Sequence, residues 1–319
     1  MEKNKRTSKV ERAHLHAEPS VPSGLWRWWY RRGRFGLSHA ALILLAATML
    51  VPFLWMVFAS IKPLEEVEQL NPFPTRWVSA KGMAPFDHGV LRRIARYVPG
   101  NYVEVFREIP FARYYFNSLF VAAWVTFLQC LTSSLAAYAF ARLHWRGRDH
   151  VFRLYLATLM IPGVVTMIPN YTLMVKLGLL DSYAGLIVPA AFSAVGTFLL
   201  RQFMLTIPPS LDEAAAIDGA SHWQIFWDVI LPLARPGLIT LGIFTFLGNY
   251  GSFFWPLILI KSEHLRTLPI GMLYFDSMYG KQTNLIMAAS VMNIIPLIIL
   301  FVVSQKFIVK GIQLGAVKG

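Results

Sequence analysis

The chain has 319 residues, of which 55% are hydrophobic and only 15% are charged, and its mean hydropathy is +0.48. About a quarter of the residues of a soluble domain are charged, so this composition excludes an ordinary soluble protein. A net charge of +13 would suggest a nucleic-acid partner in a soluble chain, but here the charges must first be placed relative to the apolar segments. The single cysteine, Cys130, excludes an intramolecular disulfide.

Six apolar segments are long enough to cross a membrane, whose hydrocarbon core of about 30 Å requires about 20 mostly apolar residues in a helix. They lie at about 39–59, 114–140, 152–175, 183–204, 236–260 and 285–309. Several contain proline, which a membrane helix tolerates when its neighbours satisfy the freed backbone groups. The sequence therefore predicts an all-α, polytopic membrane protein with about six transmembrane helices in a bundle.

Basic residues outside these segments predict the orientation of the chain. Residues 1–38 contain nine Lys and Arg against three acidic residues, the 141–153 loop contains four against one, and the tail after residue 305 contains three lysines and no acid. Short cytoplasmic loops are enriched in Lys and Arg. We therefore expect cytoplasmic termini, a basic cytoplasmic tail at 1–38, a transmembrane domain at 39–319 and an outer loop at about 60–113.

An aromatic and basic cluster precedes the first apolar segment and reads Trp26-Arg27-Trp28-Trp29-Tyr30-Arg31-Arg32. This composition is typical of an interfacial belt at the inner leaflet, so we expect the lipid bilayer as its partner and no nucleic acid. The first apolar segment has spanning length and no A-x-A site at its end. We therefore expect a retained membrane anchor rather than a cleaved signal peptide.

The interiors of the apolar segments carry essentially no Asp, Glu, Lys or Arg, the residues that normally mark ion and proton paths. A secondary transporter driven by protons therefore lacks its usual groups. The sequence also lacks the G-x-S-x-G, H-E-x-x-H and Walker A patterns. We predict no catalytic residues, no metal site and no enzyme activity, so a partner would have to supply the energy for uphill transport.

The segment between the fourth and fifth apolar segments predicts two short helices. Two pairs match the capping-box pattern, Ser210 with Glu213 and Ser221 with Gln224. Gly219 can take the left-handed conformation that ends a helix. We therefore expect one helix at about 211–218 and a second at about 222–230 that ends before Pro232.

This loop, at about 205–235, is acidic although the topology makes it cytoplasmic. It carries Asp212, Glu213, Asp218 and Asp228, and only Arg201 and Arg235 oppose them across residues 200–235. A docking surface for a basic partner would explain this, and the small Ala214–Ala216 run suits a helix that lies in a groove. A capped surface helix whose alanines merely favour helix formation explains the pattern equally well.

The same loop contains a longer motif, which reads E-A-A-x3-G-x9-I-x-L-P except that Val replaces Ile. It is carried by Glu213-Ala214-Ala215, Gly219, Val229, Leu231 and Pro232. Further matching stretches occur over nearly the whole chain after the tail, among them Ala137-Tyr138-Ala139-Phe140-Ala141-Arg142 and Thr267-Leu268-Pro269. The chain therefore resembles the permease subunits of binding-protein-dependent ABC importers, in the maltose and multiple-sugar branch.

The resemblance implies a type I ABC importer permease fold in the cytoplasmic (inner) membrane. It implies a second homologous permease subunit, two ABC ATPase subunits that use ATP and Mg²⁺, and an extracytoplasmic solute-binding protein, with no cofactor bound by this chain. The coupling residues that it implies are Glu213, Ala214, Ala215, Asp218, Gly219, Leu231 and Pro232. The expected function is uptake of a sugar or oligosaccharide; permeases for a polyol or glycerol phosphate share every motif.

Polar and aromatic residues of the apolar segments are candidates to line the translocation path: Asn117, Asn249, Tyr250, Phe253 and Asn293. Packing of the aromatic residues against lipid or neighbouring helices is the alternative. Sugar permeases of this branch commonly have Trp-Asn before Trp-Pro-Leu in the fifth span, whereas this chain has Tyr250-Gly251-Ser252-Phe253-Phe254. The amide contact of the family therefore cannot be transferred to this chain.

Overall fold

The computed structural model describes residues 24–67, 76–79, 82–85, 100–277 and 280–316. The described chain is almost entirely helical, which confirms the predicted all-α class, and its strands form only two short hairpins. These are β1 (Arg76–Ser79) with β2 (Gly82–Pro85), and β3 (Asp276–Ser277) with β4 (Gly280–Lys281). The contacts divide the chain into two units, residues 1–55 and 56–319.

Three continuous helices in the described residues are long and apolar enough to cross a membrane. They are α2 (Gly24–Ser60), α5 (Phe111–Ala141) and α16 (Thr283–Ala316), with apolar stretches at Ser38–Ser60, Phe111–Ala141 and Thr283–Gln305. Each stretch is at least 23 residues long. They correspond to the first, second and sixth predicted spans.

Three pairs of shorter helices have the same apolar character but are bent at a break. Arg148–Met160 and Gly163–Lys176 bend by 100°, Tyr183–Ala191 and Ala194–Leu205 by 42°, and His222–Leu233 and Arg235–Tyr250 by 75°. The helices involved are α6 (Arg148–Ala157), α7 (Gly163–Lys176), α8 (Tyr183–Ile187), α9 (Ala194–Leu205), α11 (His222–Gln224), α12 (Leu231–Leu233) and α13 (Arg235–Tyr250). The described residues contain up to six spans if each bent pair is counted as one.

The predicted bounds of the fifth span, 236–260, are wrong. Helix α13 ends at Tyr250, and a separate helix, α14 (Phe254–Leu259), follows a break that contains Gly251. The indole N–H of Trp255 in α14 donates to the Gly185 carbonyl of α8 at 3.1 Å, so α14 is fixed against a different helix. The bent pair that replaces the predicted span begins at His222 instead.

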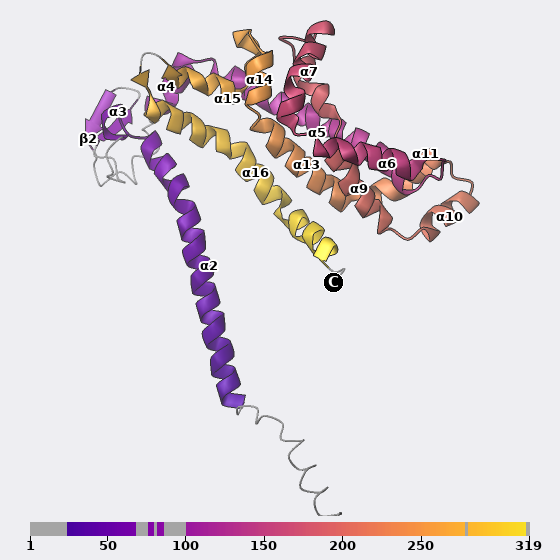
Figure 1. The fold of residues 1–319 in the computed structure, drawn as a ribbon. Coiled ribbons are helices and arrows are strands. Elements are labelled where there is room, and N and C mark those ends of the chain that lie inside the picture. The colour runs from indigo at the N-terminus through magenta and orange to yellow at the C-terminus, as the bar shows by residue number, and fades with distance from the viewer. Residues whose placement is uncertain (1–23, 68–75, 80–81, 86–99, 278–279, 317–319) are drawn as a thin grey trace, which may run out of the picture. The chain divides into compact units, whose positions relative to one another are not determined.

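Helix α5 packs against α9 and α13 in the centre of the unit formed by residues 56–319 (Figure 1). Small residues allow close approach, because a Cβ on Gly196 of α9 would lie 2.7 Å from the Ser133 hydroxyl of α5. The Thr132 hydroxyl donates to the Ala191 carbonyl at 2.6 Å, where the α8–α9 pair breaks. A polar side chain of one helix thus satisfies the freed backbone of its neighbour.

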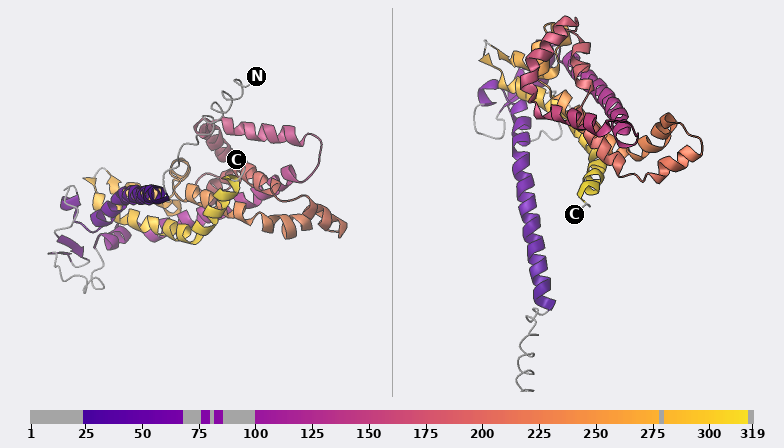
Figure 2. Two further views of the ribbon diagram at one scale, coloured as in Figure 1. Left: turned by 90° about the horizontal axis from the view of Figure 1, so that it is seen from below. Right: turned by 45° about the vertical axis from the view of Figure 1, so that its right-hand side comes forward.

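The remaining short helices lie at the two ends of this bundle: α3 (Leu64–Val67), α4 (Gly100–Glu108), α10 (Ser210–Ile217) and α15 (Leu268–Gly271). Helices α10 and α11 project together at the end opposite to α4, α14 and α15 (Figures 1 and 2). The chain thus presents two separate groups of connecting segments.

At the α14 end, Asp181 holds the segment that follows α14. Its Oδ1 accepts the backbone N–H groups of Lys261 and Ser262 at 2.9 Å, and the Ser262 hydroxyl donates to Oδ2. The bonds to Ser262 and Lys261 lower the pKa of the Asp181 carboxyl below its ordinary value. Asp181 also has a φ of 52°, a conformation that Asp and Asn accept more readily than most residues.

We predict that Asp181→Ala lowers the free energy of unfolding by about 2 kcal/mol at pH 7, because it removes bonds to a charged acceptor. Asp181→Asn should cost less, since an amide oxygen still accepts both N–H groups and Asn tolerates the positive φ. Because the pKa of Asp181 is lower in the folded protein, the carboxylate stabilises the fold fully at pH values above the ordinary pKa of Asp. This stabilisation should be lost as the pH falls through the pKa of the folded state. Thermal unfolding of the detergent-solubilised protein measures this effect. Equal unfolding temperatures for wild type and both variants at pH 7 would refute the stabilising role of Asp181.

Candidate functional site

The segment between α9 and α13, residues 205–235, is called the connecting loop below. It contains α10, a turn at Gly219, α11 and a π-helical segment, η5 (Ile225–Ile230). Gly219 has a φ of 85°, as the predicted helix-ending turn requires. Ser221 and Gln224 form the predicted capping box, with both reciprocal hydrogen bonds present.

Two local predictions for the connecting loop are wrong. Ser210 does not cap α10, because it is the first helical residue and the turn is already started by the Pro209 carbonyl. The second helix does not end before Pro232 but continues through α12 and bends at Ala234. Pro232 fits because it lies in the first turn of α12, where a missing N–H is tolerated.

Arg142 at the end of α5 joins the connecting loop to two transmembrane helices. Its Nη2 donates to the carbonyls of Met204 and Ile207 at 2.6 and 2.7 Å, where α9 ends. Its Nε lies 3.5 Å from Oδ2 of Asp212 in α10, and both side chains are largely buried. The cation thus gives the carbonyls at the end of α9 a charged donor, in addition to the Ile207 N–H that the Met204 carbonyl already accepts at 3.2 Å, and it pairs with the loop at the same time.

The electrostatics at Asp212 are a balance of opposing effects. Burial raises the pKa of the Asp212 carboxyl above its ordinary value, although the attraction of Arg142 opposes the shift. Its Oδ1 is buried without a hydrogen-bond partner among the described residues. A second bond from α5, from the Tyr138 hydroxyl to the His222 carbonyl at 3.1 Å, holds the start of α11.

The connecting loop has one packed face and one exposed face. Ala215 and Ala220 pack against a core cluster that includes Leu200, Phe226 and Ile230. The exposed face carries Glu213, Ala214, Asp218 and Gly219, together with Ile217, which is 86% exposed. Leu231 and Pro232 are half-buried at the far end of the loop, and Leu231 packs on the same cluster.

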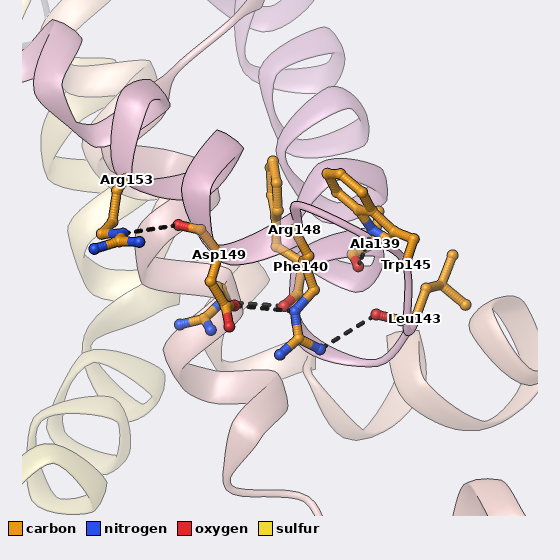
Figure 3. Close-up of polar contacts among 8 residues, drawn as sticks. Ala139, Phe140, Leu143, Trp145, Arg148, Asp149 and Arg153 are labelled. Atoms are coloured by element: carbon orange, nitrogen blue, oxygen red, sulfur yellow. Dashed lines mark hydrogen bonds and ion pairs between the residues drawn. The ribbon is translucent and has the colours of Figure 1, made fainter.

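The α5–α6 turn beside the connecting loop is braced by its own side chains (Figure 3). Arg148 bonds the Leu143 carbonyl at 3.2 Å and the Asp149 carboxylate at 3.1 Å. The Trp145 indole donates to the Ala139 carbonyl at 3.4 Å. The end of α5 that holds Arg142 is therefore a fixed support.

The five residues expected along a translocation path have different surroundings in the structure. Asn117 is 1% exposed, and its amide donates to the carbonyls of His264 and Arg266, so both amide hydrogens are used within the protein. Tyr250 is also buried and donates to the Asn293 carbonyl. Phe253 lies beside Phe254 with ring centroids 5.5 Å apart.

Asn249, one of these five, lines a cavity of about 230 Å³ between α5, α7, α8, α13 and α14. The other polar lining residues are Asn170, Ser252, Trp255 and Thr267, and none of the lining residues is charged. Asn170, Ser252 and Thr267 were not among the predicted path residues. Each of these residues is a single polar residue among mostly apolar neighbours in the sequence. The sequence therefore contained only a weak indication that they line a cavity.

Arg142 was also absent from the predicted coupling residues. The signal was present, because an arginine follows directly on an apolar segment and acidic residues occur in a later loop that the predicted topology places on the same side of the membrane. Within the described residues no group of three His, Cys, Asp or Glu side chains is placed to hold a metal ion.

The chain matches a known protein family and several known proteins. The family described as "Binding-protein-dependent transport system inner membrane component" matches residues 130–313. The arabinooligosaccharides transport system permease protein AraQ of Halalkalibacterium halodurans is 36% identical over 220 residues, which is 69% of this chain and 79% of the relative. The sulfoquinovosyl glycerol transport system permease protein SmoH of Agrobacterium fabrum is 33% identical over 285 residues, 89% and 94% of the two chains.

A third relative is the sn-glycerol-3-phosphate transport system permease protein UgpE of Yersinia enterocolitica, 36% identical over 205 residues, 64% of this chain and 73% of the relative. A solved bacterial ABC transporter that imports the acidic polysaccharide alginate has a TM-score of 0.72 and 26% identity, with 85% of this chain and 95% of that chain covered. Because the family match covers more than half of the sequence, this chain belongs to the inner membrane components of binding-protein-dependent transport systems.

Proposed function

We propose that this chain is a permease subunit of an ATP-driven importer and that its connecting loop docks on an ATPase subunit. In this proposal a second, homologous permease completes the pathway, two ABC ATPases bind ATP and Mg²⁺, and an extracytoplasmic binding protein delivers the solute. This chain itself binds no cofactor. The connecting loop and both termini face the cytoplasm, with the outer segments on the opposite side.

The exposed face of the connecting loop carries this proposal. The Glu213 carboxylate makes no hydrogen bond or ion pair within the described chain, and it lies beside alanines that allow close approach. Ile217 adds an apolar side chain that is 86% exposed. A short helix with a small, apolar and acidic face suits insertion into a groove lined with basic and apolar groups.

The packed face explains how movement of the ATPase reaches the membrane helices. Arg142, at the end of α5, donates to two carbonyls at the end of α9 and forms an ion pair with Asp212 of α10, while Tyr138 of α5 bonds the start of α11. A displacement of α10 therefore pulls on α5 and α9 together. Rigid-body movement of this kind is a common means of switching between two conformations.

The relatives support a sugar or an oligosaccharide as the solute. AraQ is named for arabinooligosaccharides, and the solved importer carries alginate. UgpE, named for sn-glycerol 3-phosphate, favours a second candidate, a phosphorylated polyol. Both candidates share the same coupling mechanism.

We predict that Gly219→Pro and Glu213→Lys leave the protein in the membrane but abolish ATPase association or ATP-driven uptake. Proline cannot adopt a φ of 85°, and lysine reverses the charge that the ATPase meets. Gly219→Asn and Glu213→Gln are the matched controls, and both should retain most uptake because Asn tolerates a positive φ and Gln keeps the shape. Co-purification and uptake into proteoliposomes measure the outcome; full uptake by Gly219→Pro and Glu213→Lys would rule the docking role out.

We predict that Arg142→Ala keeps the ATPase bound but lowers the number of solute molecules imported per ATP hydrolysed by about tenfold or more. The loss of charge-assisted bonds, worth about 1.5–3 kcal/mol each, uncouples the loop from α5 and α9 while its exposed face stays intact. Arg153→Ala is the control and should keep the coupling, since the Arg153 guanidinium bonds only the Asp149 carbonyl of its own helix. An unchanged uptake-to-hydrolysis ratio in Arg142→Ala would contradict the transmission path.

A further inference from the structure

The cavity lined by Asn249 combines unused polar groups with an apolar wall. Thr267 is only 4% exposed, and its hydroxyl has no hydrogen-bond partner among the described residues. An unpartnered polar group in a buried position is costly, which is why such groups usually bind something. The position of Thr267 in the wall of a cavity makes a ligand the partner that the fold leaves room for.

Two more polar groups of the cavity are available in the same way. The Asn249 amide uses one hydrogen for the Thr245 carbonyl at 2.8 Å, which leaves its second hydrogen and its oxygen unused. The Ser252 hydroxyl has no side-chain hydrogen bond within the described chain. Thr267, Asn249 and Ser252 thus offer both donors and acceptors.

Trp255 gives the cavity a fixed aromatic wall. Its indole N–H is used by the Gly185 carbonyl, so the ring is held against α8 rather than free to turn. Aromatic rings next to hydroxyl and amide groups suit a ligand that has apolar C–H faces and a rim of hydroxyls. A sugar ring has this distribution of polar and apolar surface.

The absence of charged residues from the cavity wall limits the class of solute that it can bind. A phosphate or carboxylate taken from water into an apolar site without a cation loses several kcal/mol of solvation. Proteins therefore bind such anions with Arg, Lys or helix N-termini. None of the residues that line this cavity is charged, so it offers no counter-ion to an acidic solute.

The size of the cavity limits how much of a solute it holds. Its volume of about 230 Å³ is below the range of about 300–1,000 Å³ that is usual for drug-sized ligands. A single sugar ring matches this space, whereas a whole oligosaccharide does not. The cavity is therefore a subsite that contacts one ring at a time.

We propose that this cavity binds one ring of an uncharged sugar, so that the solute class of this permease is neutral carbohydrate rather than glycerol phosphate or an acidic oligosaccharide. The proposal rests on the proposed function, and it narrows that function to one of the two solute classes. It also assigns a solute contact to Thr267, Asn249, Ser252 and Trp255 of this subunit.

The first test measures occupancy of the cavity directly in the assembled transporter. Ser252→Cys is introduced together with Cys130→Ala, which removes the native thiol, and alkylation by a maleimide is timed with and without solute. The probes are neutral pentose and hexose mono- to trisaccharides, sn-glycerol 3-phosphate and an alginate disaccharide. Leu177→Cys, in an exposed turn outside the cavity, is the matched control.

We expect a neutral saccharide to slow alkylation of Ser252→Cys by about fivefold or more, with no protection by the two anionic solutes and no effect at Leu177→Cys. Protection by an anionic solute, protection by none of the solutes, or equal protection at both positions would overturn the proposal. ATP-dependent uptake is measured on the same vesicles. If uptake is intact but no solute slows alkylation of Ser252→Cys, only the assignment of the cavity as a sugar site is rejected. If uptake occurs without the ATPase, the proposed function is rejected.

The second test removes one hydroxyl without a change of shape. Thr267→Val should raise the KM for uptake by about threefold to tenfold and leave kcat unchanged, because one hydrogen bond to the solute is lost. Folding should not suffer, since this hydroxyl makes no bond within the protein. Thr126→Val, whose hydroxyl bonds only the Ala122 carbonyl of its own helix, is the control, and equal KM values for both variants and wild type would refute the contact.

Discussion

The rest of the structure depends on hydrogen bonds to the backbone N–H and C=O groups that lose their partners where a membrane helix is broken. A bilayer offers no water to these groups, so every break in a helix needs a polar partner from elsewhere in the chain. Thr132 supplies it at the α8–α9 break, and Asn117 bonds two carbonyls of the segment before α15. Arg142, the residue that follows α5, bonds carbonyls at the end of α9. The helix α5 and its C-cap residue are therefore the common support of both ends of the bundle.

This constraint also links the fold to transport. The same α5 that holds the breaks at one end holds the connecting loop through Arg142 and Tyr138 at the other. The break between α13 and α14 borders the cavity, because Asn249, Ser252 and Trp255 on its two sides all line it. The same break therefore places polar side chains in the cavity wall.

Much of this architecture follows from the sequence, and the exceptions have physical causes. Uninterrupted apolar length identified α2, α5 and α16, and Gly219 with the Ser221 capping box fixed the turn in the connecting loop. The fifth span was misplaced because an apolar run does not show where its backbone breaks. The sequence shows that Asn117 is polar but not that its amide bonds the His264 and Arg266 carbonyls, which only the fold brings next to it. The cavity is formed by residues of several helices and of the segments between them, and no local pattern connects them.

The central claim is that the exposed face of the connecting loop docks on the ATPase that drives transport. Photo-crosslinking from position 217 tests it most directly, since the native Ile217 is 86% exposed and makes no part of the packed face. A photoreactive residue at this position in the assembled transporter should form a crosslink to an ATP-hydrolysing subunit, and the same residue at Leu154, an exposed position on α6, should not. A crosslink only to lipid or to a protein without ATPase activity would contradict the account.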